Sequence, residues 1–525
     1  MRPEPQTGPK HYYLEDRMKT LRMTVIIALF FLCTGVSYSQ IEDLSEGKEK
    51  QAAKKTEKTE GESGGGSKEV TFALHGYAQA NFVVSRNDMG VGGNRWINSK
   101  YQFPRVGATL QLELEGNAYD VAHFFSAVQI EYNAAGEKTN FPKFYYPNTM
   151  LQYVYYQSIA DFKRDEISKA PTVNVRETYV DLYGKHVTFR AGQQIISWGE
   201  IEGIEAPSDV VIPWDFTTMS NYFEYSRIGV VAANLTFHFA KQQLQFIWMP
   251  LFQPAKLPEE SLYKRGVTSI KRPAFEARNG EYAARLSGQI GDQFRYGLGF
   301  LYGFDDMPDT RVRMLKSPSS ILGFDLFLPK AVFTDMYYNR VMVPTLDLNI
   351  GIGEVLCWKV SANANFTKDF YGKIDLIKNS TVTYLTGPES TNLFWKIYVG
   401  LYLGQQWIIN YTKPGNMMDM LELVTMPQSN KLPNEQIIEG YGQQYPYKWM
   451  LSSNIQRSFG ESDALDFQIR FALYTDPKLK KWDYVVYPYL MYKFTNGVST
   501  SLGFVIANRL GDSRNMIISE TRYSF

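Results

Sequence analysis

The sequence predicts an all-β protein, a transmembrane antiparallel up-and-down β-barrel with about 18 strands and a range of roughly 16 to 20. Three observations favour this fold. Aromatic residues make up 15% of the chain although its mean hydropathy is only −0.29. From Val70 onward, no apolar run approaches the roughly 18 residues that indicate a membrane helix. The recurrent pattern in that region is instead the alternation of apolar and polar residues, which is typical of barrel strands.

Three segments show this alternation most clearly. In the first, Val106, Ala108, Leu110, Leu112 and Leu114 alternate with Thr109, Gln111, Glu113 and Glu115. Similar segments run from Leu356 to Phe366 and from Leu465 to Leu473. Each predicts a strand with one apolar and one hydrated face. Because backbone polar groups must be paired within lipid, such strands cross a membrane only as a closed sheet.

Short and long connections alternate along this region, as expected for tight periplasmic turns and longer external loops. The predicted short turns lie near Gly116-Asn117, Gly184-Lys185, Lys241-Gln242, Gly291-Asp292, Gly351 to Glu354, Gly404-Gln405, Gly460 to Asp463 and Asn496-Gly497. The predicted long connections include 199–222, 305–335 and 368–390. An even number of strands returns both ends of the barrel to the same side of the membrane.

The N-terminus predicts export. Lys19 and Arg22 precede an apolar run from Thr24 to Val36, and small residues up to Ser39 suit a signal peptidase. We therefore expect a signal peptide over residues 1–39, a disordered periplasmic leader over 40–68 and the barrel over 69–525. The compact signal that begins at Met18 suggests that the true start lies there. The alternatives to a cleaved signal peptide are an uncleaved membrane anchor and a lipoprotein signal at Cys33. The alternative to a merely flexible leader is a tether to peptidoglycan or to a partner.

Charge and cysteine content exclude several classes of function. Removing residues 1–39 leaves 50 basic and 51 acidic side chains, so no basic excess indicates nucleic-acid binding. The same step leaves Cys357 as the only cysteine, which excludes an internal disulfide and a cysteine metal site. No cofactor is expected. A secreted β-sandwich or β-propeller is the rival fold, but neither a blade repeat nor a disulfide framework is present.

The C-terminus ends in an alternating stretch in which Tyr523 and Phe525 are the last two members. It resembles the terminal signal that the barrel-assembly machinery recognises. This resemblance implies that both aromatic residues form an assembly signal.

A second resemblance covers Arg176 to Pro258, roughly a sixth of the chain. Its motif consists of Arg176-Glu177, Tyr179, Gly192-Gln193-Gln194, Trp198-Gly199-Glu200, Asp209, Pro213, Asp215, Pro250, Pro254 and Pro258. This stretch resembles an uncharacterised proteobacterial outer-membrane porin-like family, which is distantly similar to alginate-export barrels. The sequence has Ile212-Pro213-Trp214-Asp215 where the family usually shows Asn-Pro-x-Asp. The resemblance implies an outer-membrane location and a role in transport, with hydrophobic cargo supposed for some relatives.

A constriction is predicted inside the barrel. The Trp198-Gly199-Glu200 segment joins an alternating strand to a loop rich in carboxylates, and a loop of this kind can fold into the lumen. The hypothesis places pore residues at Arg190, Gln194, Trp198, Glu200, Asp209, Asp215, Arg285, Arg295, Lys359 and Arg470. In this hypothesis, the carboxylates of Glu200, Asp209 and Asp215 face Arg190. The alternative is that the loop forms a rigid external turn. Charged residues on the predicted inward phase also include Arg105, Glu131, Asp347 and Asp466. Over the whole inward phase, basic side chains outnumber acidic ones.

The histidines provide the only candidates for a metal. His186 and His238 are expected to face inward on neighbouring strands, which makes them weak metal candidates, although any polar side chain in a barrel must face the lumen. No serine or cysteine stands beside a histidine at a spacing that indicates acyl transfer, so no enzyme activity is expected.

Together these patterns predict an outer-membrane channel for small polar or anionic solutes. The expected surroundings are outer-membrane lipid and lipopolysaccharide, and nucleic acid is not an expected partner. One alternative is an exporter outlet for hydrophobic or lipid-like cargo that works with an inner-membrane partner. Another is a plugged barrel that acts as a surface receptor or a structural protein. Single-channel conductance would distinguish the channel from the plugged barrel.

Overall fold

The computed structural model describes residues 70–525, apart from short gaps and the longer stretches 96–100, 134–170, 202–205, 216–219, 221–225, 257–266, 372–376, 412–434 and 439–446. The predicted signal peptide (1–39) and leader (40–68) lie outside the described residues, and both remain predictions.

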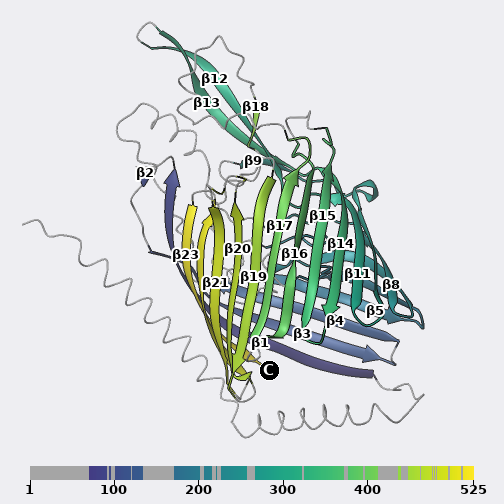
Figure 1. The fold of residues 1–525 in the computed structure, drawn as a ribbon. Coiled ribbons are helices and arrows are strands. Elements are labelled where there is room, and N and C mark those ends of the chain that lie inside the picture. The colour runs from purple at the N-terminus through teal and green to yellow at the C-terminus, as the bar shows by residue number, and fades with distance from the viewer. Residues whose placement is uncertain are drawn as a thin grey trace, which may run out of the picture. The chain divides into compact units, whose positions relative to one another are not determined.

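The wall of the molecule is a closed antiparallel barrel (Figure 1). Its strands are β1 (Val70–Val91), β3 (Tyr101–Ala118), β4 (Ala122–Asn133), β5 (Thr172–Tyr183), β6 (Val187–Gln194), β7 (Val230–Phe239), β8 (Gln242–Met249), β10 (Glu281–Ile290), β11 (Phe294–Phe304), β14 (Arg340–Ile352), β15 (Leu356–Thr367), β16 (Thr381–Leu393), β17 (Ile397–Ile408), β19 (Tyr447–Phe459), β20 (Leu465–Thr475), β21 (Trp482–Lys493), β22 (Val498–Arg509) and β23 (Asp512–Ser524). The sheet also contains the two-residue strand β2 (Asn94–Arg95), which pairs with β1. Eighteen strands therefore form the ring, which confirms the predicted fold class.

The ring closes where the two ends of the barrel sequence meet. β1 pairs with β23 in an antiparallel register from Tyr77↔Ser524 to Met89↔Asp512. Phe525 and Gly76 extend this pairing with two backbone hydrogen bonds of 3.0 Å. Closure leaves no free edge within the ring, as a barrel in lipid requires.

The two faces of the wall differ as the alternation predicts. On β3, Leu112 and Leu114 are 37% and 40% exposed on the outside, whereas Gln111 faces the lumen and is 4% exposed. On β15, Trp358 is exposed and Lys359 is buried inside. The barrel therefore has an apolar outer surface and a polar interior along these strands.

A second, four-stranded sheet contains β9 (Val267–Lys271), β12 (Asp309–Ile321), β13 (Phe324–Tyr337) and β18 (Glu435–Ile438). β12 and β13 form an antiparallel hairpin in the connection between β11 and β14. The loop expected at 305–335 is wrong, because these residues pair as a hairpin. Figure 1 shows it beyond one end of the barrel strands.

One predicted turn is wrong. Gly404-Gln405 lies inside β17, and residues 381–390, expected in a loop, belong to β16. A Cβ atom at Gly404 would lie 1.8 Å from the carbonyl oxygen of Tyr384, so the glycine permits close strand pairing and does not mark a turn. The predicted turn at Gly291 is present, and its φ of 62° explains the glycine.

Helix contributes little to the described part of the chain, where the 3-10 turn η3 (Ala277–Asn279) joins β9 to β10. Within the same residues, no helix has the length and apolar character needed to span a bilayer.

Candidate functional site

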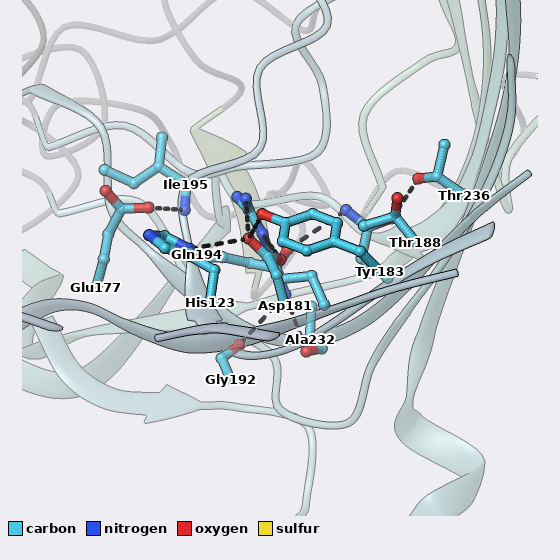
Figure 2. Close-up of polar contacts among 12 residues, drawn as sticks. His123, Glu177, Asp181, Tyr183, Thr188, Gly192, Gln194, Ile195, Ala232 and Thr236 are labelled. Atoms are coloured by element: carbon cyan, nitrogen blue, oxygen red, sulfur yellow. Dashed lines mark hydrogen bonds and ion pairs between the residues drawn. The ribbon is translucent and has the colours of Figure 1, made fainter. Parts of the chain in front are cut away.

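The chain leaves the wall at the end of β6, one of the shortest strands of the ring. Gln194 is fully buried, and its side-chain amide donates to the carbonyl oxygen of Ala232 over 3.0 Å. The next backbone amide, that of Ile195, donates to the Glu177 carboxylate over 2.8 Å. Figure 2 shows both contacts. They fix the point at which the chain turns away from the wall after Gln194, and we call the described residues between 195 and 229 the lumen loop.

Apolar side chains show that the lumen loop folds into the barrel. Trp198, Val211 and Ile212 form one buried cluster with inward-facing wall residues. The wall residues of this cluster are Val230, Ala232, Ile247, Met249, Ala283, Leu301, Val341 and Val343. Their neighbours along the strands, such as Trp248 and Met342, are exposed on the outer face. The loop therefore packs against the inside of β7, β8, β10, β11 and β14.

The loop also reaches the next part of the ring. Ile201 packs with Leu385 of β16, Tyr402 of β17 and Met450 of β19 in a second buried cluster. With the first cluster, this places described loop residues against the inner wall from β7 to β19. The apolar residues of the loop cover the inward apolar side chains that would otherwise line a water-filled passage.

Polar contacts anchor the loop backbone to β14 and β15. The hydroxyl of Ser208 donates to Asp347 over 2.6 Å, and its amide donates to the hydroxyl of Ser361 over 3.2 Å. The Lys359 ammonium donates to the carbonyl oxygen of Glu200 over 2.7 Å, and the Asn363 amide to that of Pro207 over 2.6 Å. We call these four contacts the wall anchor.

Asp209 stabilises the loop from within. Its carboxylate accepts from the backbone amide of Trp198 over 3.1 Å and pairs with Arg227 over 2.5 Å. Burial raises the pKa of Asp209, against the opposing effects of Arg227 and of the backbone amide of Trp198. The carboxylate is therefore enclosed by its own loop and does not point into a passage.

Two residues of the wall contact the Trp198 side chain. Its indole N–H donates to the Gln245 side chain over 2.9 Å, and the Arg285 guanidinium lies 5.8 Å from the ring centroid. Gly299 leaves room for the ring, because a Cβ atom there would lie 2.8 Å from it. Arg285 also pairs with Asp347 over 3.2 Å.

Arg190 does not face the loop carboxylates as hypothesised. It forms a two-pronged contact of 2.6 and 2.8 Å with Asp181 on the neighbouring strand and stacks over Tyr179 at 3.9 Å. His123 lies 3.3 Å from the same carboxylate (Figure 2). Asp181 is 1% exposed, so Arg190 is occupied by a buried partner within the wall.

The remaining predicted residues have separate environments. Asp215 pairs with Lys256 over 3.1 Å, and Lys359 pairs with Glu389 over 2.8 Å in addition to its loop contact. Arg295 lies on β11 opposite Asn349 of β14, and Arg470 lies on β20 opposite Asn454 of β19. The structure therefore brings only part of the hypothesised set together.

His186 and His238 are neighbours through their backbones, since the amide of His238 donates to the carbonyl of His186 over 2.8 Å. The ring of His238 lies 3.0 Å from the Thr188 hydroxyl, and His186 is exposed in the turn between β5 and β6. The described residues contain no group of three or more His, Cys, Asp or Glu suited to a metal ion.

The side of the lumen that the apolar clusters do not cover contains a polar cavity of about 840 Å³, including the part open to solvent. It lies between the loop and strands β1, β3, β4 and β5. Its lining includes Gln79, Asn81, Arg105, Glu131, Asn174, Asp215, Arg227 and Lys256. We call this space the solute cavity.

Ser208, Arg227, Gln79 and Asn81 belong to the site but are not singled out by any sequence pattern. The two amides stand on the hydrated phase of β1, a signal that places them inside the barrel but not beside a loop 140 residues away in the chain. Ser208 contacts a wall residue 139 positions away in the chain, so no local sequence pattern indicates this contact.

Tyr523 lies near the end of β23 and Phe525 directly follows the strand, with their ring centroids 6.2 Å apart. The Phe525 ring lies against Gly76, where a Cβ atom would be 2.9 Å from it. The structure thus gives both residues a place at the seam of the barrel.

No family model matches the chain, and no curated protein does. Solved structures with a similar fold include Acinetobacter baumannii OccAB4, at 9% identity and a TM-score of 0.48 over 86% of this chain and 98% of that chain. Pseudomonas aeruginosa OpdL is similar at 9% identity and a TM-score of 0.45 over 86% and 98%. The Pseudomonas aeruginosa outer membrane protein opdK is similar at 8% identity and a TM-score of 0.45 over 86% and 99%. Identities this low say nothing about which solutes this chain handles.

Proposed function

We propose that this protein is an outer-membrane channel for small polar solutes, and that solutes pass through the solute cavity. The observation that carries this proposal is the division of the lumen. The lumen loop covers the apolar inner wall of β7 to β14, whereas the cavity beside β1 to β5 is lined by polar and charged side chains. Hydrated lining of this kind is what a channel needs for polar solutes.

The apolar outer face supports the membrane location. Large apolar side chains such as Phe82, Leu298 and Leu502 are exposed on the outside of strands all around the ring. Exposed apolar surface on this scale is unfavourable in water and favourable in lipid. In this account, residues 1–39 direct export, and Tyr523 and Phe525 are read by the barrel-assembly machinery.

The lining of the lumen gives less support to the alternative function, an exporter outlet for hydrophobic cargo. A hydrophobic cargo needs an apolar passage, but the inward apolar residues of the wall pack against Trp198, Val211 and Ile212 of the loop. The likeness of 176–258 to a porin-like family close to alginate-export barrels therefore bears, in this proposal, on location and transport and not on cargo.

The test is single-channel recording with the refolded mature chain in a planar bilayer. A heat-modifiable gel shift first shows that the barrel is folded. The proposal expects steady open steps whose size is reproducible from channel to channel. Folded protein that inserts and stays silent would contradict it and favour the plugged receptor.

A further inference from the structure

The outer face of the barrel has an apolar groove over β6, β7, β8, β10 and β11. Its volume is about 760 Å³, including the part open to the surroundings. Four aromatic rings and two alanines line most of it: Phe246, Trp248, Tyr282, Phe300, Ala233 and Ala284. The four aromatic side chains are 43 to 49% exposed, so they stand on the membrane side of the wall. We call this space the outer groove.

The two alanines create the outer groove because they interrupt rows of large side chains. Directly paired residues lie on the same face of a sheet. Strand register places Ala284 between Phe246 of β8 and Phe300 of β11. In the next row, Ala233 lies opposite Trp248. Each alanine contributes a single methyl group, so the space between the rings is not filled by protein.

An aromatic row places the outer groove in the leaflet on the side of the long connections. Trp248, Tyr282 and Tyr302 pair across β8, β10 and β11, and all three are exposed on the outer face. Tryptophan and tyrosine gather where the hydrocarbon meets the headgroups. The tight turn at Gly291 lies at the opposite end of β10. The outer groove therefore belongs to the outer leaflet in the proposed orientation.

A cation lies one row beyond this aromatic row. Arg340 is opposite Phe304, and its guanidinium lies 4.2 Å from the Phe304 ring centroid and 4.8 Å from that of Tyr302. Its N–H groups donate to the backbone carbonyl oxygens of Gly280 over 2.9 Å and of Arg278 over 2.7 Å. These two acceptors carry no net charge, so they hold the guanidinium in place without neutralising it.

The chain between β9 and β10 adds further positive charge. Residues 271–280 carry three exposed basic side chains and one exposed acidic one: Lys271, Arg272, Arg278 and Glu276. Arg278 pairs with Glu276, which leaves two basic residues of this segment in excess. Glu281, the next acidic residue, is only 7% exposed. We call Arg340 together with residues 271–280 the cationic edge.

We propose that the outer groove and the cationic edge bind lipid A, the phosphorylated and acylated anchor of lipopolysaccharide. One acyl chain lies over Ala233 and Ala284 between the aromatic rings, and a phosphate group lies at Arg340. Pro344, four residues after Arg340, shares a row with Phe300 and Ala284. At about 3.3 Å per residue, the cation is roughly 13 Å above the groove. One leaflet of hydrocarbon is roughly 15 Å deep, so a single lipid reaches both.

The chemistry of the two parts favours lipid A over other lipids. An apolar groove accepts any acyl chain, but a guanidinium binds phosphate through parallel N–H donors and favours a lipid that carries more than one negative charge. Lipopolysaccharide is the lipid of the outer leaflet that has these phosphates. This inference goes beyond the proposed channel function and does not depend on whether the lumen conducts.

Native mass spectrometry of the refolded mature chain in detergent counts bound lipids directly. The titrations use lipid A with both phosphates, the same lipid A after removal of its phosphates, and phosphatidylglycerol, which carries one negative charge. We expect saturable binding of one phosphorylated lipid A. The dephosphorylated form should bind about tenfold more weakly, as loss of a charge-assisted contact predicts, and phosphatidylglycerol should also bind more weakly.

Variants locate the site. Ala284→Leu fills the outer groove and Arg340→Gln removes the cation, and each should weaken lipid A binding about tenfold. Ala364→Leu is the matched control for the first, since Ala364 is an outward alanine of β15 that does not line the groove. Lys241→Gln is the control for the second, because it removes an exposed cation from the turn between β7 and β8. A heat-modifiable gel shift shows that each variant is folded.

The contrary results are specific. Equal binding of lipid A with and without its phosphates would overturn the inference, and so would unchanged binding in both the Ala284 and the Arg340 variants. A second copy of this chain is the competing occupant, so an oligomer in detergent that Ala284→Leu dissociates would also overturn it. Single-channel conductance is measured independently, and a failure of this inference leaves the channel function standing.

Discussion

Ser208 of the lumen loop donates its hydroxyl hydrogen to Asp347 of β14 over 2.6 Å, across 139 positions of sequence. Asp347 is 2% exposed and also accepts from Arg285 over 3.2 Å. One buried carboxylate therefore joins a loop residue to an arginine that faces Trp198. This arrangement makes the position of the loop dependent on the wall.

Removing this carboxylate should release the loop. In Asp347→Ala, Arg285 stays buried without its partner, and losing one member of such a pair costs on the order of 3 kcal/mol. Ser208→Ala removes only the hydroxyl contacts, a loss of about 1 kcal/mol. Single-channel recordings should show a larger and noisier current in Asp347→Ala and a smaller effect in Ser208→Ala.

Asp466→Ala is the control for this prediction. Asp466 is also a buried inward carboxylate, and it pairs with Lys493 over 2.7 Å on neighbouring strands without a described contact to the loop. It should lower the stability of the barrel but leave the open-channel noise unchanged. Equal noise in the Asp347 and Asp466 variants would show that Asp347 does not hold the loop.

Ion selectivity should follow the charges of the solute cavity. Asp215→Asn leaves Lys256 unpaired and should shift the permeability ratio toward anions, whereas Lys256→Gln should shift it toward cations. Arg190→Gln removes a lumen charge but should leave the ratio unchanged, because neither Arg190 nor its partner Asp181 lines the cavity. Reversal potentials in a salt gradient measure the three ratios. A larger shift in Arg190→Gln than in the cavity variants would restore the original constriction hypothesis.

Acidification should steady the loop. The pKa of Asp209 is raised by burial in the folded loop, so the folded loop binds a proton more readily than a released loop does. By linkage, protonation stabilises the loop position at low pH, and this stabilisation is lost as the pH rises through the pKa of Asp209. Open-channel noise should therefore fall as the pH is lowered from 7. In Asp209→Asn this contribution should disappear, and noise that rises on acidification would contradict the assignment.

The last residue of the chain should matter for closure. Deleting Phe525 removes two backbone hydrogen bonds to Gly76 and the ring that covers this glycine. We expect less heat-modifiable protein in the membrane fraction. Phe525→Tyr keeps the ring and the backbone contacts, so it should assemble almost normally. Unchanged assembly of the deletion variant would remove Phe525 from the assembly signal.

Period-two alternation predicted the barrel because the membrane and the lumen impose opposite solvents on alternate residues, whereas the number of strands was predicted from the succession of short and long connections. Leu112 and Gln111 show this alternation directly. The turn signals failed at Gly404, where a glycine allows close strand pairing and does not mark a turn. Alternation also did not anticipate the β12–β13 hairpin, since a strand outside the membrane has no such constraint.

The site was less accessible to sequence reasoning. The sequence around Trp198-Gly199-Glu200 left open whether the loop folds inward or forms a rigid external turn. In the structure Trp198, Val211 and Ile212 pack against the inner wall. The partners of the loop residues, such as Asp347 for Ser208, depend on contacts between residues far apart in the chain. Arg190 and the loop carboxylates share a lumen, but each forms an ion pair with a nearer partner, which composition alone does not reveal.

The account depends on solutes passing beside β1 to β5 and not beside β7 to β14. Thiol accessibility during single-channel recording tests this directly, in a Cys357→Ser background. Asn174→Cys lines the solute cavity, and Val343→Cys lies beneath the lumen loop. A charged thiol reagent should reduce the current in Asn174→Cys and leave it unchanged in Val343→Cys. A reduction in Val343→Cys with none in Asn174→Cys would contradict the account.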